Sequence, residues 1–259
     1  MRVWKAETGV FLAVAFVAAG LLGAVQPATG VPAEVVQLTQ FGPAAGVLVV
    51  ALLWPGRIRE RLAGTLPERG SRARGRGLLL TALLIIGLAA GAYALWTGSP
   101  GFTDPRTLAH PFALVVAAQL VGACGEEIGW RCFLQPLLSA RFGPWAASLL
   151  VGAVWGVWHV GVFAETPAYA AGFLVATVAM SVVLGLGLER IRANRLLLAG
   201  GFHTLVNLGM LLFMDEESGA AAPMALFGLA CLVAAVPWAV VAGRRAPLDT
   251  IVAARRGAL

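Results

Sequence analysis

Long apolar segments separated by short polar links dominate the chain, and most are about as long as a membrane-spanning helix. We count eight of them in the 259 residues, at about 8–25, 41–54 with a start near Val35, 77–96, 111–135, 145–163, 168–188, 196–213 and 224–241. A helix of about 20 apolar residues crosses the hydrocarbon core, where its own backbone bonds satisfy its polar groups. The pattern predicts an all-α, polytopic membrane bundle of about eight transmembrane helices, forming one domain over residues 1–259.

The composition agrees with a protein that has lipid as its solvent. Hydrophobic residues make up 59% of the chain and charged residues only 12%, and the mean hydropathy is +0.83. Soluble domains carry about twice that charged fraction, so no separate soluble domain is expected. The basic start and first apolar segment could pass for a signal peptide, but the segment is long and continuous. We therefore expect a retained first span.

Positive charge falls on every second link, which is the pattern that orients membrane proteins. The basic side chains lie before the first segment, in the links after the second, fourth and sixth, and in the tail: Arg2, Lys5, Arg57, Arg59, Arg61, Arg69, Arg72, Arg74, Arg76, Arg141, Arg190, Arg192, Arg195, Arg244, Arg245, Arg255 and Arg256. The other links hold Arg106 and the acidic residues Glu34, Asp104, Glu165, Asp215, Glu216 and Glu217. We predict a multi-pass protein of the cell membrane with both termini in the cytoplasm. The net charge of +6 then reflects topology and lipid contact, not nucleic-acid binding.

The fourth apolar segment contains three ionisable residues, Glu126, Glu127 and Arg131. Each costs about 2.5–3.5 kcal/mol in the hydrocarbon region unless it is paired or faces a wet cavity. Glu127 and Arg131 are four residues apart, so they share a helix face and can pair. Glu126 points about 100° away and has no local cation. It is either protonated or faces a polar partner, and such a glutamate can serve as a proton acceptor.

Two further segments present polar groups on one helix face each, Trp155 with His159 and His203 with Asn207. Helix rise places Glu126 about 14 Å, His203 about 10 Å and His159 about 21 Å from the cytoplasmic ends of their segments. One shared site is permitted by these depths, although His159 lies deeper. A lone histidine or one Glu–Arg pair is often structural, but two glutamates, two histidines, an arginine and an asparagine together predict a functional cluster.

Several remaining features favour packing or surface roles. The spacings Gly125-xxx-Gly129 and Gly152-xxx-Gly156 allow close helix approach. We expect His110 at the membrane interface, the run 215–217 in a solvated loop, and the three cysteines, Cys124, Cys132 and Cys231, as packing residues. The link 57–76 could contact anionic headgroups, although a topology role is sufficient to explain it.

The motif order Glu-Glu-x-x-x-Arg, aromatic-x-x-x-His and His-x-x-x-Asn resembles the CAAX-protease and bacteriocin-processing (CPBP, or Abi) family of intramembrane endopeptidases. Two stretches strengthen the resemblance: the sequence EEIGWRCFLQPLL, which begins at Glu126, and the sequence Gly-Val-Trp-His, which ends at His159. It covers about residues 115–210, within a presumed catalytic core at about 111–213. Trp155 departs from the phenylalanine that the family usually has there.

The resemblance implies hydrolysis of a peptide bond within the membrane, and eukaryotic members remove the last three residues of prenylated proteins. Carried over, Glu126 activates water with help from His159, while His203 and Asn207 stabilise the oxyanion. Glu127 with Arg131 holds the helix or orients the base. The expected partners are lipid and a membrane-associated peptide or protein.

A metal-free mechanism without a cofactor is favoured over the zinc dependence long assumed for the family. Zinc sites use three protein ligands with an open position, and Glu126, His159 and His203 could supply them. However, the sequence has no HExxH pattern, and Asn207 is a poor zinc ligand.

Two other functions compete with the enzyme. Intramembrane Glu, His and Arg also occur in proton-coupled transporters, but we find no inverted repeat or broken pair of segments. A non-catalytic scaffold or immunity protein of the same fold would not need all four presumed catalytic residues.

Overall fold

The fold is taken from a computed structural model that describes residues 3–66, 72–99, 101–189, 191, 193–214 and 219–257. Side chains are described throughout these ranges except at 72–74 and 245–257. The predicted acidic loop at 215–217 lies outside the described residues, as do Arg2, Arg69, Arg190 and Arg192.

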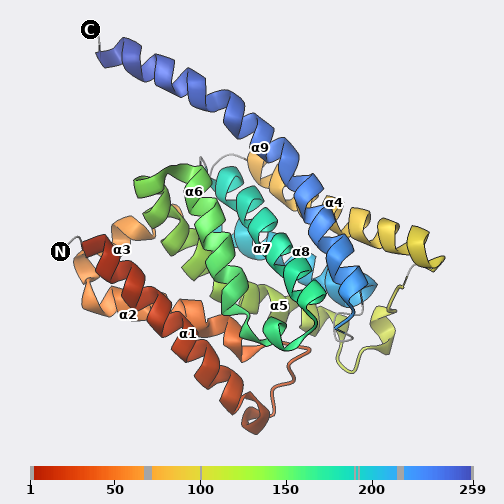
Figure 1. Ribbon diagram of the computed structural model, residues 1–259. Coiled ribbons are helices and arrows are strands. Elements are labelled where there is room, and N and C mark those ends of the chain that lie inside the picture. Colours follow the sequence, from red (N-terminus) through yellow and green to blue (C-terminus); the bar gives the residue numbers. More distant parts are fainter. Residues whose placement is uncertain are drawn as a thin grey trace.

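The described residues form a bundle of helices and contain no strand (Figure 1). The elements in chain order are α1 Val3–Thr29, η1 Leu38–Phe41, α2 Gly42–Leu53, α3 Pro55–Arg61, α4 Arg72–Thr97, η2 Pro105–Thr107, α5 Phe112–Glu127, the π-helix η3 Ile128–Leu134, α6 Gln135–Trp158, η4 Val160–Ala164, α7 Pro167–Leu188, α8 Arg195–Phe213 and α9 Ala221–Gly257.

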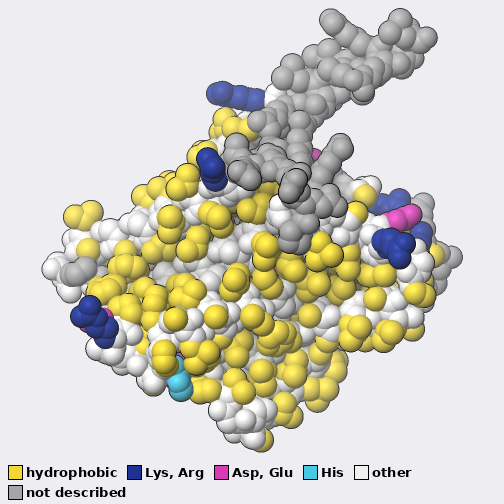
Figure 2. Space-filling model, turned by 180° about the vertical axis from the view of Figure 1, so that it is seen from behind, with side chains coloured by type: hydrophobic (Ala, Val, Ile, Leu, Met, Phe, Trp, Pro, Cys, Tyr) yellow, Lys and Arg dark blue, Asp and Glu magenta, His cyan; other side chains and the backbone are white. Residues whose placement is uncertain are grey.

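Six helical stretches of the described chain are long and apolar enough to cross a membrane. One of them, Phe112–Trp158, holds both the fourth and the fifth predicted segments, which Gly143 separates with its positive φ of 79°. The second predicted segment falls on the shorter apolar stretch Leu38–Leu53. Figure 2 shows a face of the molecule on which hydrophobic side chains cover most of the surface and charged ones lie at its edges. The predicted polytopic helical membrane fold is confirmed.

The fifth predicted segment, 145–163, is wrong at its end, because the helix stops at Trp158. His159 leaves the helix with φ −77° and ψ 63°, and its Nδ1 lies 2.8 Å from the carbonyl oxygen of Trp155. That oxygen would accept the backbone N–H of His159 in a continuing α-helix. The side-chain nitrogen takes the place of the backbone N–H at this carbonyl.

The fourth predicted segment, 111–135, is not one regular helix. It begins as α5, changes at Ile128 into the π-helix η3 and passes at Gln135 into α6.

Both predicted glycine pairs lie where helices approach closely. A Cβ at Gly125 would lie 2.9 Å from the Phe41 ring, and one at Gly152 would lie 2.8 Å from the Cα of Val178 in α7. Such distances leave no room for a side chain, so these glycines set how closely the helices that carry the site can pack.

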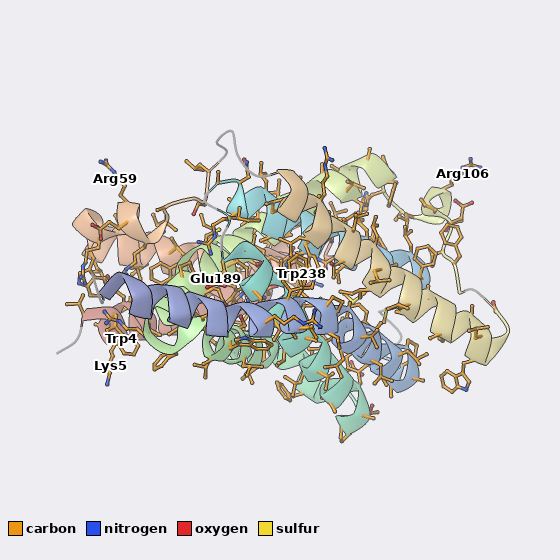
Figure 3. All side chains as sticks on the ribbon, turned by 90° about the horizontal axis from the view of Figure 1, so that it is seen from above. Trp4, Lys5, Arg59, Arg106, Glu189 and Trp238 are labelled. Carbon is orange, nitrogen blue, oxygen red and sulfur yellow. The ribbon has the colours of Figure 1, made fainter. Side chains whose placement is uncertain are left out.

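Alternate links meet at the same end of the bundle. The Arg61 guanidinium contacts Glu7 at 2.9 Å, and Arg141 lies over the ring of Trp4. At the other end, His110 Nε2 lies 3.1 Å from Glu34 Oε1. Figure 3 shows Arg59 with Trp4 and Lys5 at one end and Arg106 at the other. The basic links therefore lie at one end of the bundle, and the acidic links lie at the other.

Candidate active site

A cavity of about 630 Å³ brings together polar side chains from three of the predicted membrane segments. Glu126, Trp155, His159, His203 and Asn207 all line it. Its other lining residues include Glu34, Thr103, Thr107, His110, Glu165 and Gly219, which belong to the links at the Arg106 end. The predicted cluster is thus one site, and its cavity extends toward that end of the bundle.

Glu126 is held by an indole. Its side chain is 2% exposed, and Trp155 Nε1 donates a hydrogen bond of 2.9 Å to Oε2. The Trp155 ring contacts the Arg131 guanidinium, with Cζ 4.8 Å from the ring centre, and packs edge-on against His203. The polar partner that Glu126 required is therefore Trp155, on the helix that follows.

Glu127 lies behind the cavity and contacts the side chains of His203 and Arg131. Its Oε1 lies 2.9 Å from His203 Nδ1, and its Oε2 lies 3.2 Å from Arg131 Nε. Both Glu127 and Arg131 are fully buried, and Arg131 Nη1 also donates to Ser181 Oγ at 3.2 Å. The predicted Glu127–Arg131 pair is present, but Glu127 orients His203 and not the presumed base, Glu126.

The site stands at a change of helix type. The π-helix Ile128–Leu134 starts directly after Glu127, and π turns are rare and often occur at functional sites. Arg195 Nη2 donates to the Arg131 carbonyl at 3.1 Å, so a backbone acceptor within this segment is satisfied from α8. The Glu127–Arg131 ion pair joins the last residue of α5 to this π-helix.

Each histidine has one ring nitrogen engaged by the protein. The Trp155 carbonyl can only accept, so His159 Nδ1 carries the hydrogen and, in the neutral ring, Nε2 is an acceptor. His203 Nδ1 lies 2.9 Å from Glu127 Oε1 and donates to it when Nδ1 carries the hydrogen. With both nitrogens protonated, His203 has a second donor left for a ligand. His159 therefore offers a hydrogen-bond acceptor to a ligand, and His203, when both of its nitrogens are protonated, offers a donor.

Asn207 is oriented by a residue that the sequence analysis did not single out. Gln119 Nε2 donates to the Val35 carbonyl at 3.4 Å, which places Gln119 Oε1 toward Asn207. Asn207 Nδ2 then donates to Oε1 at 3.0 Å. Because a backbone carbonyl only accepts, this chain fixes which end of the Asn207 amide is the nitrogen.

Three glutamines that line the cavity were missed, Gln119, Gln40 and Gln37. Gln119 lies seven residues before Glu126. This spacing of two turns places both residues on the same helix face, so helical periodicity could have identified Gln119 as a site residue. Gln40 lies at the start of the second apolar segment, and nothing in its sequence surroundings points to the site.

The zinc alternative would use Glu126, His159 and His203 as its ligands. Within the described residues, no group of three or more His, Cys, Asp or Glu side chains is arranged to hold a metal ion. Glu126, His159 and His203 line one cavity without forming such a group. The three cysteines are free thiols, Cys124 partly buried and the other two buried.

Comparison with known proteins places the same region in a family context. Residues 108–209 match the family described as type II CAAX prenyl endopeptidase Rce1-like. The chain is also 23% identical over 218 residues to Lysostaphin resistance protein A from Staphylococcus aureus strains MRSA252 and bovine RF122 / ET3-1. That match covers 83% of this chain and 52% of each relative, so the chain spans about half the length of these relatives. The resemblance drawn from the motifs is confirmed.

Proposed function

We propose that this chain, which carries the Rce1-like region of the CAAX-protease and bacteriocin-processing family, is an intramembrane endopeptidase. The observation that carries the proposal is the placement of Glu126. Its carboxylate is buried, held by Trp155 and directed to a cavity that also receives His159, His203 and Asn207. A positioned carboxylate beside an amide and a histidine donor matches the needs of water-mediated acyl transfer.

In the proposed reaction, Glu126 takes a proton from water as the water oxygen attacks the scissile carbonyl. His159 Nε2 is an acceptor in the same cavity and helps to hold that water. The carbonyl oxygen becomes an oxyanion, which Asn207 Nδ2 and the second nitrogen of His203 stabilise by donating hydrogen bonds. Collapse of the intermediate breaks the C–N bond, and Glu126 returns its proton to the leaving amine.

The remaining polar groups hold this arrangement. Glu127 accepts from His203 and is balanced by Arg131, so the buried carboxylate is not left without a cation. No cofactor is invoked, and the substrate is a membrane-associated peptide or protein that reaches the cavity from the membrane or from the Arg106 end.

Proteolysis by the purified protein in liposomes tests the proposal. A library of membrane peptides is incubated with wild type, Glu126→Gln, His159→Ala and the control Glu60→Gln, which changes an exposed glutamate of α3. Products are read by mass spectrometry, with and without chelator. Cleavage by wild type and Glu60→Gln, with at least a hundredfold loss in Glu126→Gln, is expected. Loss under chelator would replace the glutamate mechanism with a metal mechanism.

A non-catalytic role is the second candidate, because the curated relatives are named for lysostaphin resistance and not for proteolysis. A scaffold or immunity protein would keep its cellular effect in the Glu126→Gln variant. Folded wild-type protein that cleaves no peptide of the library would put this role first.

A further inference from the structure

The cavity of the candidate site carries negative charge without a matching cation in its wall. Three of the residues that line it are glutamates, Glu34, Glu126 and Glu165, and none of the described lining residues is a lysine or an arginine. The buried Arg131 does not line the cavity and is already paired with Glu127. A concave site lined by one sign of charge attracts ligands of the opposite sign.

Two of these glutamates belong to links at the Arg106 end, where the lining side chains are open to solvent. The side chain of Glu34 is 41% exposed, and its Oε1 lies 3.1 Å from His110 Nε2. A neutral histidine donates at this place and leaves the charge of the carboxylate intact. Glu165 is exposed and forms no ion pair with a described residue. Its Oε2 lies against Gly219, which also lines the cavity.

The inner glutamate has one oxygen left for a ligand in the same cavity. Glu126 is 2% exposed, and Trp155 binds only its Oε2. Its Oε1 has no hydrogen-bond donor among the described residues, yet it is not one of the atoms sealed inside the protein. A peptide bound in the cavity therefore meets carboxylate oxygens both at the proposed base and at the outer links.

The distance from the site to the outer carboxylate is short. His159 and Glu165 are joined by the 3-10 turn Val160–Ala164. At about 2 Å per residue, this turn places their Cα atoms about 12 Å apart. An extended peptide covers about 12 Å in roughly four residues. A substrate that is cut beside His159 therefore brings a side chain roughly four residues from the scissile bond to Glu165.

We propose that the cavity selects substrates with a cationic group roughly four residues from the scissile bond, which Glu34 and Glu165 bind. The group is a lysine or arginine side chain or a free amino terminus. The inference rests on the proposed endopeptidase function and deepens it by naming the substrate class. The same two charges disfavour a carboxylate at this place. Removal of three C-terminal residues would bring the terminal carboxylate close to Glu165, so such substrates are expected to be poor.

The test measures binding in the Glu126→Gln background, so that it does not depend on cleavage. Apolar peptides captured on the immobilised chain are remade with lysine, glutamine or glutamate at one position at a time, and capture is quantified by mass spectrometry. The ratio of lysine to glutamate capture is compared with that of a protein that also carries Glu34→Gln and Glu165→Gln. Glutamine removes the charge and keeps an acceptor for His110.

The matched control is Asp104→Asn. Asp104 is an exposed acid at the same end of the bundle, but it does not line the cavity. Its side chain accepts from the Arg106 N–H at 2.9 Å, and asparagine can accept the same bond. A second variant, Glu165→Lys, reverses the outer charge and should shift the preference toward the glutamate peptides.

We expect the lysine form of a peptide to be captured roughly tenfold better than its glutamate form at one position. The preference should fall to less than about threefold in the double variant and should weaken as salt is added. Asp104→Asn should leave it unchanged. The thermal stability of each variant should equal that of its parent, since exposed carboxylates contribute little to folding.

Equal capture of the lysine and glutamate forms at every position would overturn the inference, as would a preference that survives the double substitution. An equal effect of Asp104→Asn, or failure of any peptide to bind, would overturn it as well. Lysine peptides that bind through Glu34 and Glu165 but are never cleaved by wild type would refute only the proposed function. Cleavage with the same kcat/KM for both forms would refute only the inference.

Discussion

Trp155 supplies a hydrogen bond that phenylalanine, the usual family residue at this place, could not supply. Its Nε1 donates to Glu126 while its ring contacts Arg131 and His203. The bond to a carboxylate is charge-assisted, and such bonds contribute about 1.5–3 kcal/mol. In the sequence, Trp155 is only a departure from the usual phenylalanine, whereas the structure shows that it is the direct partner of Glu126.

Trp155→Phe should lower kcat roughly tenfold or more and change KM little, because the aromatic packing remains while the orientation of Glu126 is lost. Steady-state proteolysis in liposomes measures both constants. The matched control is Trp238→Phe, which removes an indole donor to Thr81 Oγ1 outside the site. Equal losses in the two variants would show that the effect is one of stability alone.

Gln119 should affect the reaction only through Asn207, because it fixes the amide orientation of that residue. We expect Gln119→Leu to reduce kcat by roughly tenfold. In a double-mutant cycle, Gln119→Leu should have little further effect once Asn207→Ala is present. Additive losses in kcat would mean that Gln119 has a role of its own.

At the scale of elements, the contact between α6 and α7 holds the cation of the site. Ser181 of α7 accepts from Arg131 and donates to the Ser148 carbonyl of α6 at 2.7 Å. Gly152 lies at the same contact, where a Cβ would be 2.7 Å from that of Ser181. The spacing of these two helices therefore determines where Arg131 is held.

Gly152→Ala should destabilise the protein by about 1–3 kcal/mol, because the added methyl meets the backbone of α7. Thermal unfolding in detergent measures the change. The control is Gly87→Ala in α4, where a Cβ meets nothing within 4 Å. Alanine favours a helix over glycine, so that control should be neutral or stabilising, and a stable Gly152→Ala would contradict the packing argument.

Sequence periodicity predicted the helices better than it predicted their ends and types. The seventh predicted segment, 196–213, agrees with α8 within one residue, because apolar length and flanking charge define it. The π-helix after Glu127 has a tertiary partner, Arg195, which the local sequence does not reveal. The exit at His159 depends on its side chain, which contacts the Trp155 carbonyl four residues earlier in place of the backbone N–H, and apolar periodicity does not show that exchange.

At the scale of the molecule, the motifs predicted which residues share the site but not how they pair. Glu126, His159, His203 and Asn207 do line one cavity. The positions of Gln40 and Gln119 depend on how the link 35–41 packs on α5. That packing joins segments that are far apart in the chain, and helical periodicity carries no information about it.

The charge pattern predicts that the Arg106 end of the bundle, toward which the cavity extends, faces away from the cytoplasm. Single cysteines at Arg59 and Arg106, in a background without Cys124, Cys132 and Cys231, test this with a membrane-impermeant thiol reagent. Both arginines are exposed and lie at opposite ends (Figure 3). Arg106→Cys should react on intact cells and Arg59→Cys only after permeabilisation, and the reverse result would invert the topology.

The tight corner at Gly143 also has a consequence for biosynthesis. Because it folds Phe112–Trp158 back on itself, these two helices can leave the translocon as one hairpin. The hairpin already contains Trp155 for Glu126 and Arg131 for Glu127, so both carboxylates enter lipid with their partners. His203 emerges later and joins a carboxylate that is already paired. The order of synthesis thus spares the growing chain an unpaired charge in the bilayer.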